Sequence, residues 1–121
     1  MPADFATRHE PQENGRHIIA VAGEIDLYTA PDLKQLLTQV IEDGASGVVM
    51  DLSETTFLDS TGLGVLIGGL KRLRSRDGAL AVVNVDDSIS RTFEITGLDQ
   101  IFTIRTSRDE ALAALDAELA A

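Results

Sequence analysis

The sequence of 121 residues contains no cysteine and no tryptophan, and its aromatic residues are limited to four phenylalanines and one tyrosine. Without cysteine, the chain has neither a disulfide framework nor a thiolate that could serve as nucleophile or metal ligand. No apolar run approaches the roughly 20 residues of a membrane-spanning helix. Residues 1–15 also lack the apolar core of a signal peptide. We therefore expect a cytoplasmic protein that does not enter a membrane.

Basic residues are scarce, with 10 lysines and arginines against 20 acidic residues and a net charge of −10. A chain this acidic repels nucleic acid and anionic membranes unless its cations form a separate patch. The one basic cluster, residues 71–76, matches the last turn of a predicted helix, where cations are favoured by the helix dipole. We expect no nucleic-acid partner, and a basic or arginine-bearing protein surface suits the charge better.

Histidine is equally scarce, and the two present, His9 and His17, do not have the spacing of a zinc site. We expect His9 in a mobile N-terminal segment and His17 at a strand end. Neither forms a plausible triad with Ser60, which also lacks a nucleophile elbow. The glycines of residues 62–69 are not followed by the Lys-Ser/Thr of a phosphate-binding loop. The sequence thus indicates no catalytic group, no metal and no cofactor.

Acidic residues follow several predicted strands and could meet at one edge of a sheet, where α/β proteins hold ligands. We interpret these residues as loop and helix-cap residues: Asp51, Asp59, Asp86 and Asp87. A phosphoacceptor at Asp51, as in response-regulator receivers, would need an acidic pair after the first strand and a lysine after a later one. No acidic pair is so placed, and the only lysines, Lys34 and Lys71, fall in predicted helices.

The remaining composition, 44% apolar and 25% charged, is that of an ordinary globular domain, and we expect one domain over residues 1–121, with residues 1–15 as an N-terminal arm. Strands alternate with helices, which predicts an α/β fold with a mixed, mostly parallel sheet. The continuous apolar run of residues 47–52 suggests burial on both faces or a covered centre. A short strand is predicted near Phe5, and a turn at 13–16 joins it to a second strand over 17–23. Further strands are predicted over 47–52, 79–85 and 101–104. Residues 24–28 and 53–59 are predicted as loops. Helices are predicted over 29–44, 60–73, 86–97 and 107–119, with Thr29 and Ser107 as caps and Ile89, Phe93 and Ile95 buried.

The predicted helix after Ser60 has an apolar stripe at helical spacing, from Leu63 to Leu73. Asp59, Ser60 or Thr61 should cap it. The helix also contains Gly64, Gly68 and Gly69, each costing about 1 kcal/mol relative to alanine. A close neighbour would account for them, and that neighbour is either the sheet of the domain itself or a partner protein.

Four segments in register resemble the bacterial anti-sigma factor antagonists, which are STAS domains. The first, residues 57–66 (FLDSTGLGVL), is similar to the family's signature around its acceptor serine. The other three are residues 23–26 followed by Thr29 and Ala30, the central strand 49–52, and residues 95–98. The resemblance covers about Ile18 to Leu119 and implies a mixed sheet with helices packed on one face, in the order β-β-α-β-α-β-α-β-α.

The resemblance also implies a partner-switching function in transcription regulation, with no catalysis by this chain. In the family, the unmodified antagonist binds an ATP-using anti-sigma factor serine kinase, which then releases its sigma factor. The kinase phosphorylates the serine that corresponds to Ser60, binding is lost, and a cognate serine phosphatase restores it. The implied partner-binding residues are Glu24, Asp26, Asp59, Ser60, Thr61, Gly62, Gly64, Val65 and Gly68.

A second interpretation stays open, in which this is a STAS module with another partner or ligand. A stressosome-like scaffold and a nucleotide-binding regulator both belong to that class. We expect a monomer or weak dimer in either case.

Overall fold

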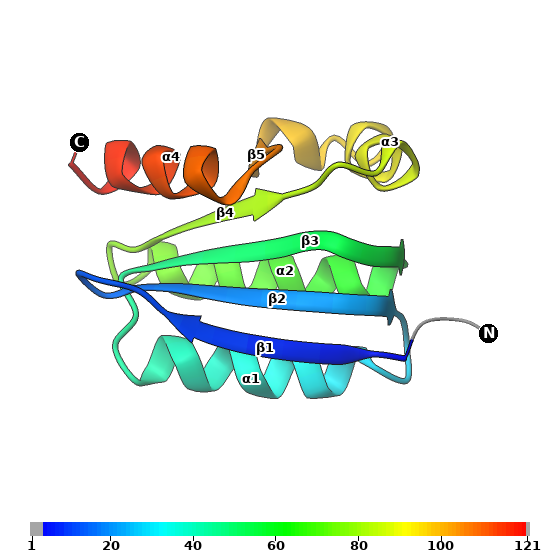
Figure 1. The fold of residues 1–121 in the computed structure, drawn as a ribbon, viewed down its shortest axis with the longest axis horizontal. Helices are drawn as coiled ribbons and strands as arrows, with labels where there is room; N and C mark the ends of the chain where they lie inside the picture. The colour runs from blue at the N-terminus through cyan, green and yellow to red at the C-terminus, as the bar shows by residue number, and fades with distance from the viewer. Residues whose placement is uncertain (1–3, 121) are drawn as a thin grey trace.

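The computed structural model describes residues 4–120, in which five strands form one sheet. The strands are β1 (Ala6–Pro11), β2 (Arg16–Ile25), β3 (Gly47–Leu58), β4 (Ala79–Val83) and β5 (Thr103–Arg105). The helices are α1 (Ala30–Glu42), α2 (Ser60–Arg74), α3 (Asp87–Ile95) and α4 (Arg108–Ala120), with a 3₁₀ turn η1 (Leu98–Gln100) before β5. The predicted order of strands and helices is confirmed (Figure 1).

The sheet is mixed, as predicted, and its strands lie in sequence order from β1 to β5. β1 runs antiparallel to β2, and β2 to β5 are parallel. Asn14 and Gly15 form the predicted turn with φ of 58° and 75°, a conformation that these two residue types accept readily. The carboxyl ends of the parallel strands therefore lie at one edge of the sheet, and the first turn of each following helix begins there.

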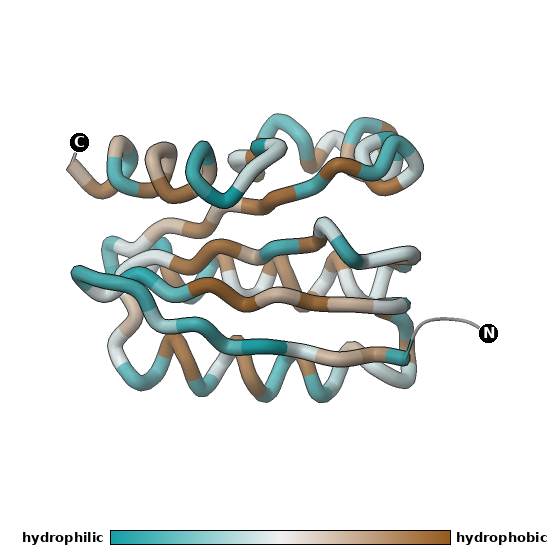
Figure 2. The backbone as a smooth tube through the Cα atoms, viewed as in Figure 1, coloured by the Kyte–Doolittle hydropathy of each residue, from teal (hydrophilic) through white to brown (hydrophobic). Residues whose placement is uncertain are grey.

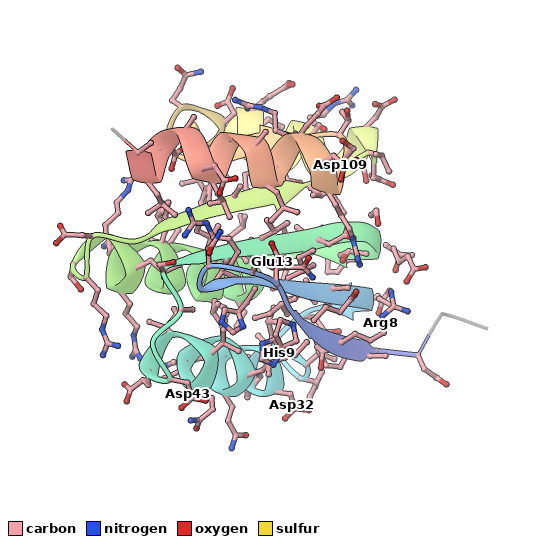
Figure 3. The ribbon with its side chains drawn as sticks, turned by 60° about the vertical axis from the view of Figure 1, so that its left-hand side comes forward. Arg8, His9, Glu13, Asp32, Asp43 and Asp109 are labelled. Atoms are coloured by element: carbon pink, nitrogen blue, oxygen red, sulfur yellow. The ribbon has the colours of Figure 1, made fainter. Side chains whose placement is uncertain are left out.

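Helices cover both faces of the sheet, so the implied packing on one face is wrong. Alternate residues of β3 point in opposite directions: Val48 and Met50 join α1, α2 and α3 in the main core, whereas Val49 packs in a second core with Ala111 and Leu115 of α4. Figure 3 shows α4, which carries Asp109, and α1, which carries Asp32 and is followed by Asp43, on opposite sides of the strands. The continuous apolar run of the central strand did indicate burial on both faces.

The two central strands are longer than predicted, because residues 24–25 and 53–58 continue the ladder. Ile25 pairs with Leu58, and register shifts near Ala20 and Gly23 accommodate the polar residues between them. Thr55 is buried, and its hydroxyl donates a hydrogen bond of 2.8 Å to the carbonyl oxygen of Val21. Residues 53–58 were predicted as a loop because most of their side chains are polar, and most of them are exposed in the strand.

Two further expectations are wrong. Ile95 is not buried but 78% exposed at the end of α3. His9 does not lie in a mobile segment: it is paired with Ile19 within the sheet, and its Nε2 lies 2.8 Å from Nδ1 of His17. His9 was placed outside a strand because β1 has little apolar pattern. Figure 2 shows that this edge strand is largely hydrophilic beside the hydrophobic β2 and β3.

Across the described residues, no helix has the length and apolar character needed to cross a membrane.

Candidate partner-binding site around Ser60

The parallel pairing of β2 and β3 brings two distant acidic residues to the same edge of the sheet. Ile25 and Leu58 are register partners, and each is followed directly by an aspartate, Asp26 and Asp59. The backbone N–H of Asp59 donates a hydrogen bond of 3.1 Å to the carbonyl oxygen of Ile25. The loop before α1 and the start of α2 are thus joined by the sheet.

Of the three predicted cap residues, Asp59, Ser60 and Thr61, it is Asp59 that is the N-cap of α2. Its backbone is extended, and its Oδ1 accepts a hydrogen bond of 3.0 Å from the N–H of Gly62. Ser60 is the first residue of the helix and is exposed, while Thr61 is half-buried. The cap therefore does not use the Ser60 hydroxyl. The N-terminus of a helix favours negative charge, and this serine is presented on it.

Asp26 organises the loop between β2 and α1. Its Oδ1 accepts hydrogen bonds from the backbone N–H groups of Tyr28 and Thr29, at 2.9 and 3.0 Å. Thr29 holds the predicted N-cap position of α1, but its hydroxyl donates to the carbonyl oxygen of Glu24 at 2.8 Å and makes no side-chain cap of the helix. Asp26 holds its loop in place beside the start of α2.

Two apolar side chains of this loop are exposed beside the predicted site and were not predicted as part of it. Leu27 is 64% exposed and Tyr28 is 87% exposed. Phe57, the residue before Leu58, is also 48% exposed, and strand alternation directs it with Glu24 to the sheet face opposite Ile25. The sequence does contain an indication of Leu27 and Tyr28, because they are apolar residues in a stretch predicted as a loop.

The glycines of α2 separate into two groups. A Cβ on Gly62 would lie 2.5 Å from Leu58 Cδ1, and one on Gly69 would lie 2.5 Å from Leu37 Cδ2, so both glycines allow close internal packing. A Cβ on Gly64 or Gly68 would meet nothing within 4 Å. The domain's own packing accounts for the first two glycines only. Gly62 is buried and offers no side chain to a partner, whereas Gly64 and Gly68 open onto a surface groove.

This groove lies between α1 and α2 and has a volume of about 490 Å³. From α1 it is lined by Ala30, Pro31, Lys34, Leu37 and Thr38, and from α2 by Thr61, Gly64, Val65, Gly68, Gly69 and Arg72. Four of the expected partner-binding residues, Thr61, Gly64, Val65 and Gly68, therefore share one concave surface that begins next to Ser60.

The acidic residues after the end of β4 have local roles at the start of α3. Asp86 caps α3, because its carboxylate accepts hydrogen bonds from the N–H groups of Ser88 and Ile89, at 2.9 and 3.1 Å. It also accepts a hydrogen bond from the Ser88 hydroxyl. The bond from the hydroxyl, and then those from the two N–H groups, hold the pKa of Asp86 below its ordinary value. Asp87 is the exposed first residue of α3. Within residues 4–120, no group of three or more His, Asp or Glu side chains could hold a metal ion.

Asp51 lies inside β3, as the strand predicted over 47–52 has it, so its interpretation as a loop or cap residue is wrong. It is buried within β3, and its Oδ2 lies 2.7 Å from Nε of Arg108 at the start of α4. The same guanidinium donates to both carboxylate oxygens of Glu10 in β1, at 3.1 and 3.0 Å. Burial raises the pKa of Asp51, but hydrogen bonds from Arg108 and the Ser53 N–H outweigh it and hold the pKa below its ordinary value. This network fixes α4 to the sheet and lies on the face away from α2.

Comparison with known proteins gives one consistent result. Residues 8–111 match the family model described as STAS domain. An anti-sigma-B factor antagonist of Listeria monocytogenes is 45% identical over 94 residues, which cover 76% of this chain and 81% of the relative. One of Staphylococcus aureus, carrying the same name, is 41% identical over 86 residues, 71% of this chain and 80% of that protein.

The similarity extends to solved structures. The crystal structure of an anti-sigma factor antagonist from Mycobacterium paratuberculosis superposes with a TM-score of 0.87 at 33% identity, over 96% of this chain and 99% of the other. The family model spans both the Ser60 segment and the strands that position it. The chain belongs to the STAS domain family.

Proposed function

We propose that this protein is an anti-sigma factor antagonist whose binding to its anti-sigma factor is switched by phosphorylation at Ser60. The unphosphorylated protein binds an ATP-using anti-sigma factor serine kinase, which releases its sigma factor. Two close relatives that bear the name of anti-sigma-B factor antagonists support the first part of this proposal.

The observation that supports the phosphorylation switch is that Asp59, and not Ser60, caps α2. Asp59 supplies the cap of α2, so modification of Ser60 removes no hydrogen bond on which the helix depends. A phosphate adds about −1.5 to −2 charges, and the free N–H groups and dipole of the helix favour it there. Modification therefore leaves the fold intact.

Binding responds differently from folding. Asp59 and Asp26 lie at the same sheet edge as Ser60, so a phosphate adds charge to an already acidic neighbourhood. A partner surface shaped for a neutral hydroxyl would lose a contact and face a dianion. A loss of about 3 kcal/mol weakens binding by about a hundredfold.

The protein acts in this scheme as a substrate and a binding partner and not as a catalyst. A cognate serine phosphatase removes the phosphate and restores binding. We place the contact surface on Asp59, Ser60, Thr61, Gly64, Val65 and Gly68, with Glu24, Asp26 and Gly62 at its border or supporting it. We also propose that the chain folds as one domain and is a monomer or weak dimer.

The test is incubation of the purified protein with ATP and candidate anti-sigma kinases, followed by mass measurement and peptide mapping. One added phosphate at Ser60, together with loss of the complex, is the expected result. If the protein binds none of the kinases and stays unmodified, the proposal is overturned in favour of a STAS module with another partner.

A further inference from the structure

The groove between α1 and α2 has a regular shape because each helix presents a single face to it. Its α2 residues recur from Thr61 through Gly64, Val65 and Gly68 to Arg72, at the three- and four-residue spacing of one helix face. Eleven residues of rise make this stretch about 16 Å long. The groove is therefore an open trough of about three helical turns.

The base of the trough is apolar and its two sides are cationic. Leu37 and Val65 contribute apolar side chains, and the absent side chains of Gly64 and Gly68 leave the space open. Lys34 on α1 and Arg72 on α2 are both exposed and line the groove from opposite sides. Arg72 Nη1 lies 3.4 Å from the hydroxyl of Thr38, so the guanidinium reaches toward α1.

Neither of these cations forms an ion pair with a carboxylate of residues 4–120. The ion pairs of this part of the chain involve Arg8, Arg16 and Arg108, none of which lines the groove. Most other lysines and arginines also lack an ion pair within the described residues, but Lys34 and Arg72 line one groove from opposite sides. They make the groove a local site of positive potential on an acidic molecule, which favours an acidic occupant.

The groove is continuous with the surface around Ser60. Thr61, the residue after Ser60, lines one end of the groove, and Gly68 lies eight residues beyond Ser60 along α2, about 12 Å away along the helix axis. A protein that contacts Ser60 is therefore within reach of the whole trough.

We propose that the α1–α2 groove receives an amphipathic helical segment of the anti-sigma factor, which carries acidic side chains beside apolar ones. This inference rests on the proposed function and deepens it, because it names what the α2 part of the contact surface binds and adds the α1 side of the groove to that surface. The apolar face of the segment lies over Leu37, Val65 and the two glycines, and its carboxylates pair with Lys34 and Arg72. An amphipathic helix in a hydrophobic groove is a common mode of peptide recognition.

A second copy of the chain suits the groove less well, because two molecules of the same net charge repel one another. A small amphipathic carboxylate is the other competing occupant, since a groove of about 490 Å³ is within the usual size range of small-molecule sites. Both occupants remain distinguishable by experiment.

The test compares three variants for binding to the cognate anti-sigma factor by calorimetry. Gly68→Leu fills the trough far from Ser60, and we expect its Kd to rise about tenfold or more. Arg72→Glu removes one cation and adds a like charge, and we expect a rise of about fivefold. Lys71→Glu is the matched control, because it makes the same charge change one residue away on a surface that does not line the groove, and its Kd should stay within about twofold of wild type.

Salt separates the two contributions. In about 1 M salt the Debye length falls to about 3 Å, so the Kd of Arg72→Glu should approach that of the wild type, whereas Gly68→Leu should remain weaker. Melting temperatures and circular dichroism of each variant verify that it is folded. Lys34→Glu provides an independent test on α1 if Gly68→Leu does not fold.

Several outcomes would overturn the proposal. If the anti-sigma factor binds all variants as tightly as the wild type, the groove is not a docking site and the contact surface is limited to the residues around Ser60, while the phosphorylation switch at Ser60 stands. If the wild type itself does not bind, the proposed function fails and the docking site with it. Sedimentation that shows a wild-type dimer and a monomeric Arg72→Glu variant assigns the groove to a second copy. Stabilisation of the wild type alone by decanoate, with partner binding unchanged in the variants, assigns it to a small amphipathic carboxylate.

Discussion

The backbone N–H of Asp59 donates a hydrogen bond of 3.1 Å to the carbonyl oxygen of Ile25, and this bond joins the start of α2 to the end of β2. Ile25 is fully buried, so the residue directly before Ser60 is anchored to the core. Ser60 is therefore held on a rigid support, and a change of its charge is presented to a partner without rearrangement of the domain.

Substitution of Ser60 should separate binding from stability. Ser60→Ala should remain folded and bind the anti-sigma factor permanently, because it cannot be phosphorylated. Ser60→Asp carries one charge where a phosphate would carry about two, and its Kd should be raised by a factor approaching about a hundred. Calorimetric titration of both variants measures this difference; equal affinities would contradict a charge switch at this residue.

Asp59→Ala tests whether the cap and the switch are different residues. Loss of the cap to Gly62 should lower the free energy of unfolding by about 1 kcal/mol, because one backbone N–H of the first turn loses its partner. Ser60→Ala, one residue on, should change it by less than about 0.5 kcal/mol. Urea denaturation of the two variants provides the comparison, and a larger loss at Ser60 would mean that the serine supports the helix.

Alanine at two glycines of α2 should have effects of opposite sign. A Cβ at position 62 would lie 2.7 Å from Cγ2 of Ile25, a stiff β-branched side chain, so Gly62→Ala should destabilise by about 1–3 kcal/mol. A Cβ at position 64 meets nothing within 4 Å, so Gly64→Ala should stabilise by up to about 1 kcal/mol through helix propensity. Thermal unfolding distinguishes them, and two losses of similar size would mean that Gly64 is also needed for packing.

Local patterns predicted most of the fold because they depend on residues close in sequence. The cap at Asp59 and the glycine turn at Gly15 are such features. The Asp51–Arg108 pair could not be predicted in this way, since its members are 57 residues apart and only the fold brings α4 over β3. The strand from Ser53 to Leu58 was missed because its exposed residues have the composition of a loop. The groove, in turn, depends on the relative placement of two helices, which a single helix pattern does not contain.

Removal of Arg108 should destabilise the protein more than removal of an exposed ion pair. Arg108→Ala leaves the Asp51 side chain, 6% exposed, without its counter-charge. Breaking a buried pair typically costs 3–5 kcal/mol, and since Arg108 itself is 33% exposed we expect about 2 kcal/mol. Asp116→Ala is the control, because its pair with Arg16 also joins α4 to the sheet but is 64% exposed on the aspartate, and it should cost less than about 1 kcal/mol. Equal losses in urea denaturation would mean that burial of Asp51 contributes nothing.

The paired histidines predict a dependence of stability on pH. Burial, and then the neighbouring His9, lower the pKa of His17, with Asp43 opposing them. As the pH falls through the ordinary histidine value of about 6.5, the unfolded chain takes up a proton that folded His17 resists, so the free energy of unfolding should fall. His9→Gln removes one cause of the lowered pKa and should reduce this fall between about pH 7 and 5.5, and His17→Gln should abolish it. Urea denaturation across this range measures the slopes. Because both variants keep the carboxylates of the wild type, three equal slopes would show that these carboxylates, and not His17, cause the pH dependence.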